Sequence, residues 1–444
     1  MAQAEPPKNE ITIEEFFDTV LTQAITERTS DIHIEPLVKE MSIRFRIDGI
    51  LQEKGLWPLY DLEPLTTRIK ALSNLDITTH VGPQDGHFEF LYKPNLQAAH
   101  EEETLRGKEG RSDPLSRLFG RIPGAEEEKP NPQLRAQAET VSGAQHARLF
   151  DIRVSIFPTV KGEAVVLRLL NREEMLISLK DLGLDDKEYS ALKRLITRPY
   201  GMVLVTGPAG SGKTTTLYSI LIELKSKERN IITLEDPVEL SIENIRQVQV
   251  NPTQGFDFAT GIRSILRQDP DGMMIGEIRD HETAENAIRS SLSGRIVFST
   301  IHANTVAGTI ARLMDMNIDR SLIAYALNGV ISQRLVRKIC QNCRVPYVPS
   351  PEYLKYFDID STVVHRFMKG EGCAKCSKTG FYGRVGIFEL FEFDNQLRAL
   401  IVERSPMSAL QAYIEGAGMK TLKQDAREKV LAGLTTLEEA ARAV

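Results

Sequence analysis

A glycine-rich loop between an apolar strand and a helix constrains the fold of this chain more than any other feature. The loop, residues 207–214 (GPAGSGKT), follows the apolar run 202–206 and precedes a helical pattern that begins at residue 215. In this context the backbone N–H groups of the loop and the N-terminus of the helix bind phosphate groups. The sequence therefore predicts a nucleotide site on a domain with a mainly parallel sheet.

Each part of this loop has an expected task in binding ATP. The glycines let backbone N–H groups approach the phosphates without a Cβ in the way. Lys213 is expected to reach the β- and γ-phosphates, and the Thr214 hydroxyl is expected to bind Mg²⁺. The predicted nucleotide-binding residues are Gly207, Gly210, Ser211, Gly212, Lys213, Thr214 and Thr215.

Three later strands are predicted to end in polar side chains that ATP hydrolysis requires. Glu235 ends the first of these apolar runs and Glu239 follows it, Glu277 follows the second, and His302 follows the third. Carboxylates at such strand ends hold Mg²⁺ or polarise the attacking water. His302 is a candidate for contacting the γ-phosphate, although a lone histidine is more often structural.

The pattern around the loop predicts an α/β domain. A helix is expected over 186–196, and short apolar runs at 231–235, 272–275 and 296–300 are expected to be buried strands between helices. After residue 323 the chain is predicted to be mostly helical, apart from a cysteine-bearing region.

The first third of the chain predicts a separate α+β domain. Helical spacing of apolar residues covers 10–30 and recurs over 61–75. Strict alternation over 41–47 followed by Asp48-Gly49 predicts a strand and a hairpin turn, and two more strands are expected within 150–170.

These patterns predict that the chain is divided into four domains or regions. Residues 1–175 form the small N-terminal domain, which a polar insertion at 93–148 interrupts. The insertion is expected to be flexible, either as solvated chain or as a docking segment for a partner. Residues 176–335 form a RecA-like ATPase core, 336–390 a tetracysteine zinc subdomain, and 391–444 a C-terminal helical region.

Composition excludes some classes of protein. No apolar run approaches the roughly 20 residues needed to span a bilayer, and the N-terminus does not resemble a signal peptide. We therefore expect a cytoplasmic protein. The net charge of −6 argues against a protein that coats nucleic acid, so no stable nucleic-acid binding is expected.

Four cysteines form two pairs, Cys340-x-x-Cys343 and Cys373-x-x-Cys376, and 29 residues separate the pairs. Four thiolates in this spacing are typical of a structural tetrahedral Zn²⁺ site. A redox dithiol is the alternative. A catalytic zinc is not expected, because four thiolates leave no open coordination position.

Together these motifs resemble those of the bacterial type II secretion and type IV pilus assembly ATPases. The resemblance covers nearly the whole chain outside the insertion, and the tetracysteine pairs are similar to those of the assembly and secretion branch. Besides the glycine-rich loop it rests on residues 30–36 (SDIHIEP), 83–86 (PQDG), 151–155 (DIRVS), 232–239 (ITLEDPVE), 266–271 (LRQDPD), 276–280 (GEIRD) and 299–304 (STIHAN).

The resemblance implies roles for individual residues. Glu277 would hold the metal-bound water network, Glu235 and Glu239 would help to activate water, and His302 would sense the γ-phosphate. Two arginines of the N-terminal domain, which is PAS-like by this resemblance, match the positions that approach the phosphates when the domains close. These are Arg153 and Arg168; the alternative is that both are ordinary strand-surface arginines.

The resemblance also implies partners. The family forms homohexameric rings that use ATP, Mg²⁺ and Zn²⁺ and power the assembly or export of pilin-like or pseudopilin-like subunits. The ring acts on an inner-membrane platform protein and is held peripherally at the inner membrane by a membrane-anchored recruitment protein. A related motor for DNA uptake and a zinc-containing nucleic-acid translocase are the alternative functions.

Three features depart from the family pattern. By this resemblance we expect the sequence to begin almost directly at the small domain, without the longer N-terminal domain that is usual in the family. The insertion at 93–148 is longer than usual, and Gly294-Arg295 stands where the family often has Gly-His.

Overall fold

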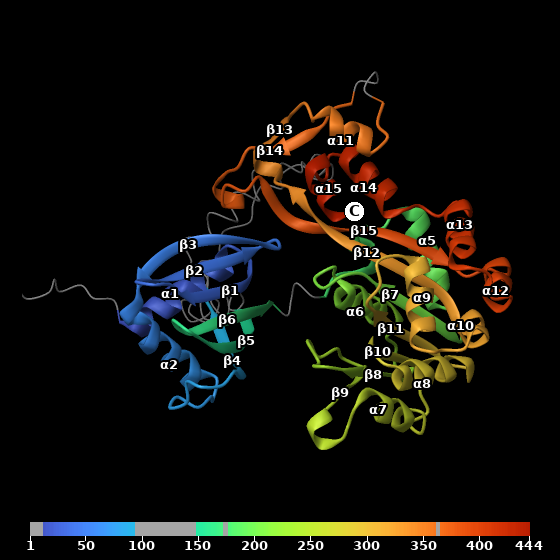
Figure 1. Cartoon of the computed structure of the whole chain (residues 1–444), viewed down its shortest axis with the longest axis horizontal. Helices are drawn as coiled ribbons and strands as arrows, with labels where there is room; N and C mark the ends of the chain where they lie inside the picture. The colour runs from blue at the N-terminus through green and yellow to red at the C-terminus, as the bar shows by residue number, and fades with distance from the viewer. Residues whose placement is uncertain (1–11, 94–147, 172–175, 361–364) are drawn as a thin grey trace, which may run out of the picture. The chain divides into compact units, whose positions relative to one another are not determined.

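The computed structural model describes residues 12–93, 148–171, 176–360 and 365–444 of the chain. They form two compact units, Met1–Asn171 and Arg172–Val444 (Figure 1). The predicted insertion lies almost wholly outside the described residues. The predicted division of the chain into four parts stays a prediction.

The first unit is an antiparallel sheet with two helices on one face. The strand order is β3-β2-β1-β6-β5-β4. Its elements are α1 (Ile13–Thr26), β1 (Thr29–Pro36), β2 (Glu40–Ile47), β3 (Ile50–Pro58), α2 (Leu62–Leu72), β4 (Gln84–Tyr92), β5 (Arg148–Thr159) and β6 (Gly162–Asn171).

Alternating side chains explain why this sheet has one covered face. Ile32, Phe45 and Ile152 point with the other apolar strand residues towards α1 and α2 and are buried with them. The predicted hairpin at Asp48-Gly49 is confirmed, since both residues have positive φ angles of 46° and 88°.

The second unit contains a seven-stranded sheet in the order β15-β12-β7-β11-β10-β8-β9. All neighbours are parallel except β12 and β15, which are antiparallel. The strands are β7 (Gly201–Thr206), β8 (Ile231–Glu235), β9 (Arg246–Gln249), β10 (Gly272–Ile278), β11 (Ile296–Ile301), β12 (Leu327–Ile339) and β15 (Phe381–Glu392). The predicted α/β class and its buried strands are confirmed.

Helices cover both faces of this sheet (Figure 1). On one face α5 (Asp186–Ile196) and α6 (Lys213–Leu224) bury residues such as Leu192 and Leu217. The other face packs against α7 (Phe258–Ile265), α8 (His281–Leu292), α9 (Val306–Asp315), α10 (Arg320–Ala326), α12 (Asn395–Val402) and α13 (Met407–Gly416).

The prediction of mostly helical chain after residue 323 is wrong for β12 and β15. β12 is thirteen residues long and lies beside β7, so it belongs to the central sheet. Its apolar residues, among them Val330, Ile331 and Val336, are buried on both faces of the sheet and therefore do not alternate with polar ones. Periodicity alone does not separate such a strand from a buried helix.

A further hydrophobic core lies around the cysteine-bearing region. Here β13 (Arg344–Pro346) pairs with β14 (Met368–Gly370), and α11 (Pro351–Tyr356) packs near the two last helices, α14 (Leu422–Leu431) and α15 (Leu437–Ala443). Phe357 and Val430 are among the buried residues that join these segments. The cysteine region and the C-terminal helices therefore share one hydrophobic core.

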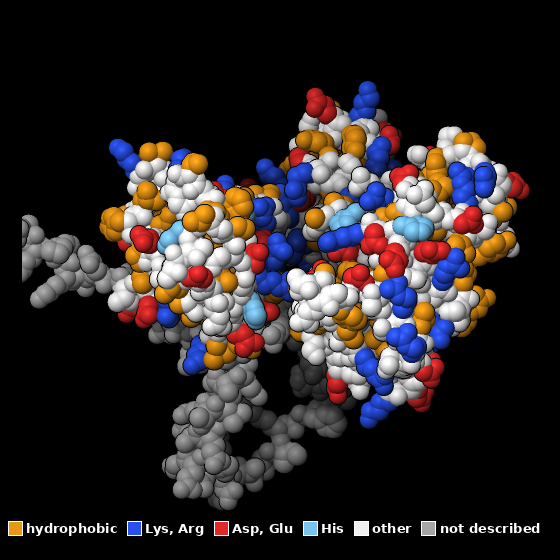
Figure 2. All heavy atoms as spheres, turned by 60° about the horizontal axis from the view of Figure 1, so that its bottom comes forward, with side chains coloured by type: hydrophobic (Ala, Val, Ile, Leu, Met, Phe, Trp, Pro, Cys, Tyr) orange, Lys and Arg blue, Asp and Glu red, His pale blue; other side chains and the backbone are white. Residues whose placement is uncertain are grey.

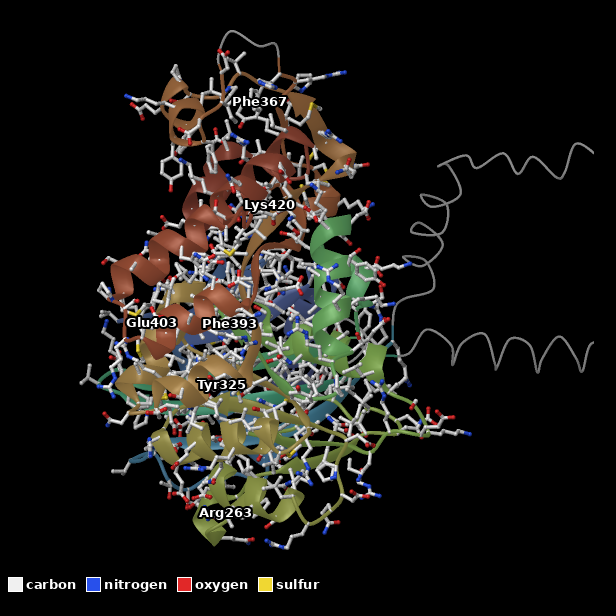
Figure 3. All side chains as sticks on the ribbon, turned by 90° about the vertical axis from the view of Figure 1, so that its right-hand side faces the viewer. Arg263, Tyr325, Phe367, Phe393, Glu403 and Lys420 are labelled. Carbon is white, nitrogen blue, oxygen red and sulfur yellow. The ribbon has the colours of Figure 1, made fainter. Side chains whose placement is uncertain are left out.

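A cluster of buried charges ties α5 to α14. Lys420 (labelled in Figure 3) donates hydrogen bonds to Asp185 at 2.6 Å and to Asp425 at 2.9 Å, and lies 3.3 Å from Glu188. Burial, and then the charge of Asp425, raise the pKa of Glu188 to about 7.

Among the helices that the structure describes, none is both long and apolar enough to cross a bilayer.

Candidate nucleotide site and tetracysteine cluster

The glycine-rich loop leaves β7 at Thr206 and enters α6 at Lys213, as predicted. Gly207 has a φ of 150°, and a Cβ at this position would lie 2.5 Å from the carbonyl oxygen of Gln333 on β12. Only glycine fits there, because the loop passes directly against the neighbouring strand. The N-terminus of α6 therefore points its free N–H groups into the loop.

Lys213 lies within the loop that it is predicted to serve. Its Nζ donates hydrogen bonds to the carbonyl oxygens of Gly207 at 2.9 Å and Pro208 at 3.0 Å. Burial lowers its pKa, and the charge of Glu277 opposes that shift. Ser211 is buried, and its hydroxyl has no hydrogen-bond partner. These groups form a cradle of donors that fits a phosphate chain.

Glu277 is placed by an irregularity in β10. Ile275 pairs with Ser299 and Ile278 with Ile301, so β10 holds one more residue than β11 over this stretch. Thr300 steadies the bulge by donating a hydrogen bond of 2.8 Å to the carbonyl of Gly276. The Glu277 carboxylate is thereby turned to the carboxyl edge of the sheet, where Arg279 lies 2.5 Å from it.

His302 follows β11 and approaches the same carboxylate. Its Nε2 lies 3.7 Å from Oε2 of Glu277, and just over half of its side chain is exposed, 53%. Burial and the charge of Lys213 lower the pKa of His302 below its usual 6.5, so the imidazole is neutral at pH 7. A neutral imidazole can donate one hydrogen bond to an anionic ligand.

Glu235 is buried at the end of β8, with an exposed fraction of 3%. It accepts hydrogen bonds from Tyr218 at 2.5 Å, from Thr233 at 2.6 Å and from Gln247 at 3.0 Å. Glu239 lies in the loop that follows, and its backbone N–H donates to the Tyr218 hydroxyl at 3.2 Å. These bonds hold the acidic loop against α6, and the predicted water-activating roles of both glutamates stay predictions.

Arg153 and Arg168 lie on the first unit, on the face of its sheet that α1 and α2 leave uncovered. They face each other across β5 and β6 in a row that continues to Asp31 on β1. Arg168 is exposed, and its Nε lies 3.0 Å from Asp31. Their predicted contact with phosphates stays a prediction.

Sequence reasoning did not find the residues that hold the site together. Gln333 and Arg334 lie on β12, the strand that was predicted as helix, and this error hid them. Arg279 lies in the 276–280 motif, but the motif alone predicts no role for it. Tyr218 lies one helical turn after the glycine-rich loop, which is the one local signal that it faces the site.

The four cysteines converge, as predicted. All four Sγ atoms lie within 4.8 Å of one another, and Cys340 is 3.8 Å from Cys373. A Zn–S bond of about 2.3 Å in tetrahedral geometry requires sulfur atoms about 3.8 Å apart. Backbone N–H groups point at the sulfurs, as Gly372 does to Cys343 at 3.3 Å. The cluster therefore has the composition and spacing to hold one metal ion.

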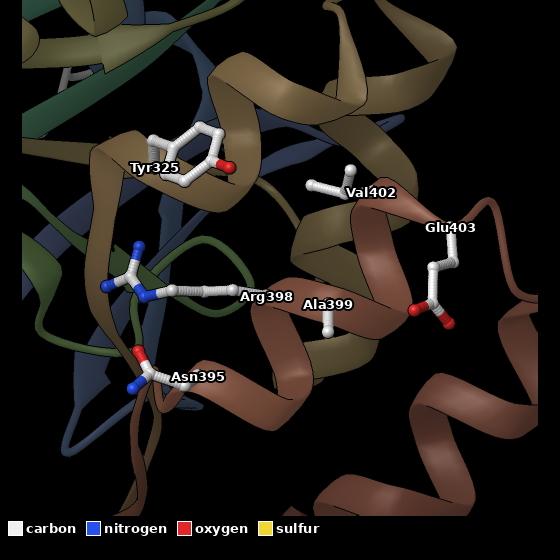
Figure 4. Close-up of a pocket in the computed structure, with 6 residues that line it drawn as sticks. All are labelled: Tyr325, Asn395, Arg398, Ala399, Val402 and Glu403. Carbon is white, nitrogen blue, oxygen red and sulfur yellow. The ribbon is translucent and has the colours of Figure 1, made fainter.

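A surface pocket of about 310 Å³ lies elsewhere, between α10 and α12 (Figure 4). Its lining residues are Tyr325, Asn395, Arg398, Ala399, Val402 and Glu403. Arg398 donates hydrogen bonds to the carbonyls of Ala324 and Leu327, so its task is to join the two helices. No residue of the nucleotide site lines this pocket.

A glycine-rich phosphate loop on a largely parallel sheet, with acidic residues and a histidine at the neighbouring strand ends, defines a RecA-like ATPase. The profile of the family described as "Type II/IV secretion system protein" matches residues 7–98 and 127–442. This chain belongs to that family.

Named relatives agree with this assignment. The type II secretion system ATPase E of Vibrio cholerae is 40% identical over 99% of this chain and 78% of its own length. The type IV pilus assembly ATPase PilB of Thermus thermophilus is 36% identical over 97% of this chain and 43% of its own length. The chain is therefore an ATPase of the type II secretion and type IV pilus assembly kind.

Solved structures agree on the fold. The chain is similar to the pilus retraction motor PilT with bound ADP, with a TM-score of 0.57, 25% identity and coverage of 95% of both chains. The ATPase DotB of Legionella pneumophila has a TM-score of 0.64 at 20% identity, over 99% of this chain and 97% of its own.

Proposed function

We propose that this ATPase works as a homohexameric motor that moves pilin-like or pseudopilin-like subunits. Its family membership and its named relatives support a secretion or pilus assembly system. One structural observation carries the proposal: Glu277 and His302, at the ends of neighbouring strands, meet Lys213 of the glycine-rich loop at one edge of the sheet. A motor needs phosphate binding and water activation at one place, and this edge combines them.

Each residue of the site has a separate role in ATP binding or hydrolysis. Lys213 turns from the loop carbonyls to the phosphates, and the unpartnered Ser211 hydroxyl and the backbone N–H groups of the loop complete the cradle. Glu277 orients the attacking water, held in place by Arg279. His302 donates a hydrogen bond to the γ-phosphate and so reports whether the phosphate is present. Glu235 and Glu239 assist from the loop after β8.

We propose two metal sites, one at the nucleotide and one at the cysteines. Thr214 and the acidic strand ends would hold Mg²⁺, which would neutralise charge on the phosphates. The spacing of the four sulfurs supports Zn²⁺ at Cys340, Cys343, Cys373 and Cys376. With four thiolate ligands this zinc is structural, and it stabilises the core shared by the cysteine region and the last helices.

The partners of the motor are proposed from the family. The ring acts on an inner-membrane platform protein, and a membrane-anchored recruitment protein holds it at the inner membrane. Arg153 and Arg168 complete the site when ATP draws the two units together, because an arginine added on closure couples hydrolysis to movement. DNA uptake by a related pilus system is the second candidate, since the same motifs would serve it.

A Glu277→Gln variant tests the catalytic assignment. The amide keeps the shape of the side chain and its contact with Arg279 but cannot accept a proton from water. We expect kcat for ATP hydrolysis to fall about 100-fold or more while the affinity for mant-ADP changes less than threefold. The exposed Glu282 on α8 provides the matched control as Glu282→Gln. Wild-type kcat in Glu277→Gln would contradict the assignment.

A further inference from the structure

Three consecutive residues of β12 contact both loops of the nucleotide site. β12 lies parallel to β7, and Ser332 pairs with Thr206, the last residue before the glycine-rich loop. Side chains alternate along a strand, so Gln333 points to one side of the sheet while Ser332 and Arg334 point to the other. We call Ser332, Gln333 and Arg334 the β12 clasp.

Gln333 holds the glycine-rich loop. Its exposed fraction is 1%, and both ends of its amide are used. Nε2 donates to the backbone carbonyl of Ser211 at 2.7 Å, and Oε1 accepts from the Thr216 hydroxyl on α6 at 2.8 Å. One side chain therefore joins the loop to the first turns of the helix that follows it.

Ser332 and Arg334 hold the loop that carries His302. The Ser332 hydroxyl donates to the backbone carbonyl of Asn304 at 3.0 Å. Arg334 donates from Nη2 to the same carbonyl and to the Asn304 side chain, each at 3.3 Å. Asn304 lies two residues after His302, so its position determines where the imidazole can reach.

The two loops also meet directly. The Thr206 hydroxyl accepts from the backbone N–H of Ala303 at 3.0 Å and donates to the Ala303 carbonyl at 2.7 Å. This pair of bonds joins the strands where they end. The β12 clasp acts further along each loop, on Ser211 and on Asn304.

We propose that the β12 clasp positions the phosphate-binding loop and the His302 loop relative to each other. Its first arm, Gln333, positions the loop for phosphate binding, and its second arm, Ser332 with Arg334, positions His302. A buried donor or acceptor that loses its partner costs free energy, so each arm resists distortion of the loop that it contacts. The two arms therefore affect different kinetic constants. The second arm rests on the proposed role of His302.

The Gln333 arm is tested by nucleotide affinity. Gln333→Met removes both hydrogen bonds at similar volume. Gln333→Glu keeps the acceptor for Thr216 but replaces the donor to the Ser211 carbonyl with a carboxylate oxygen, which the carbonyl oxygen repels. We expect both variants to bind mant-ADP about tenfold or more weakly than the wild type. Lys338→Met, an exposed change on the same strand, is the control and should bind as the wild type does.

A purely structural role of Gln333 predicts a different result. Either variant would then lower the melting temperature without ligand, while those molecules that remain folded would bind mant-ADP with wild-type affinity. That result in either variant overturns the first arm. If Gln333→Met does not fold, the near-isosteric Gln333→Glu decides alone.

The second arm is tested by turnover. The double variant Ser332→Ala/Arg334→Lys keeps the positive charge near Lys213 but loses the hydroxyl and the forked contact with Asn304. We expect kcat to fall about fivefold to tenfold with mant-ADP affinity within twofold of wild type. An equal loss in both quantities overturns the second arm.

The His302→Ala background separates this inference from the proposed function. If the second arm acts through His302, adding Ser332→Ala/Arg334→Lys to His302→Ala lowers kcat no further. A further drop of fivefold or more overturns the second arm. If His302→Ala alone has wild-type kcat, the proposed role of His302 and the second arm fail together, whereas the Gln333 arm still stands or falls on affinity.

Discussion

Glu277 and His302 lie 3.7 Å apart at the ends of two neighbouring parallel strands. The extra residue in β10 brings them together, because it turns Glu277 towards β11, the strand that His302 follows. The carboxylate also contacts Arg279 and influences Lys213. The site is thus a set of charges that β7, β10 and β11 bring together at one edge.

Replacing Lys213 should stop hydrolysis. Lys213→Ala removes the one flexible cation of the glycine-rich loop, and we expect kcat/KM for ATP to fall about 100-fold or more. The melting temperature without ligand should stay within a few degrees, since the lysine bonds only to loop carbonyls. Lys225→Ala, an exposed change just after α6, is the control. Unchanged hydrolysis in Lys213→Ala would refute the motor assignment.

His302 should make activity sensitive to acid. Because its pKa lies below the usual 6.5, the imidazole is neutral at pH 7 and gains a proton only at lower pH. We expect wild-type kcat to be level from about pH 7 to pH 8 and to change only as the pH falls below 6.5. His302→Asn should show a kcat about tenfold lower at pH 7 and no change specific to this acid range. Identical pH profiles of the two proteins would contradict the role.

The tetracysteine cluster should carry zinc and stabilise its surroundings. We expect about one zinc per chain by elemental analysis, and its loss in the variant Cys340→Ser/Cys373→Ser. The melting temperature should fall by several degrees, because the cluster joins the two ends of the segment whose Phe357 packs in one core with Val430. Gln341→Ser, an exposed change between two cysteines, should keep the metal. A zinc-free wild-type protein would show that the assignment is wrong.

The buried Glu188 should make stability depend on pH. Its pKa is raised to about 7 in the folded state, whereas an unfolded glutamate titrates at about 4.3. Between these values the folded chain holds a proton that the unfolded chain has lost, so the free energy of unfolding falls as pH rises, by about 4 kcal/mol in total. Below this window the effect is absent, and above about pH 7 it is complete.

Urea unfolding of Glu188→Gln at a series of pH values measures this effect. The amide can still cap α5, but it does not titrate. The free energy of unfolding of the variant should therefore increase relative to that of the wild type as pH rises from about 5 to about 8. Asp186→Asn, exposed on the same helix, should follow the wild type. Parallel curves for wild type and Glu188→Gln would exclude the buried carboxyl as the cause.

The sequence predicted the parts of the site that lie next to strong local signals. The glycine-rich loop and His302 each follow an apolar strand and Glu277 lies near the end of another, and such strands are recognisable one at a time. The cysteines were predicted from spacing alone. The α/β class and the alternation of strands and helices were predicted in the same way.

What could not be predicted depends on which strands become neighbours. Gln333 contacts Ser211 from 122 residues away along the chain, and no local pattern marks that pairing. β12 is buried on both faces, so its residues carry no period that distinguishes strand from helix. The hydrogen bonds of Glu235 also depend on which strands are neighbours, since Gln247 donates to it from the adjacent strand β9.

β12 runs from the clasp to Ile339, the residue before the first cysteine of the tetracysteine cluster. Because successive side chains of a strand point to opposite sides, the number of residues between Gln333 and Cys340 is constrained at both ends. Adding or removing a single residue there would turn either the glutamine away from the glycine-rich loop or the cysteine away from its three partners. Changes of length in this family should therefore be absent from this stretch, even where the side chains between its two ends vary freely.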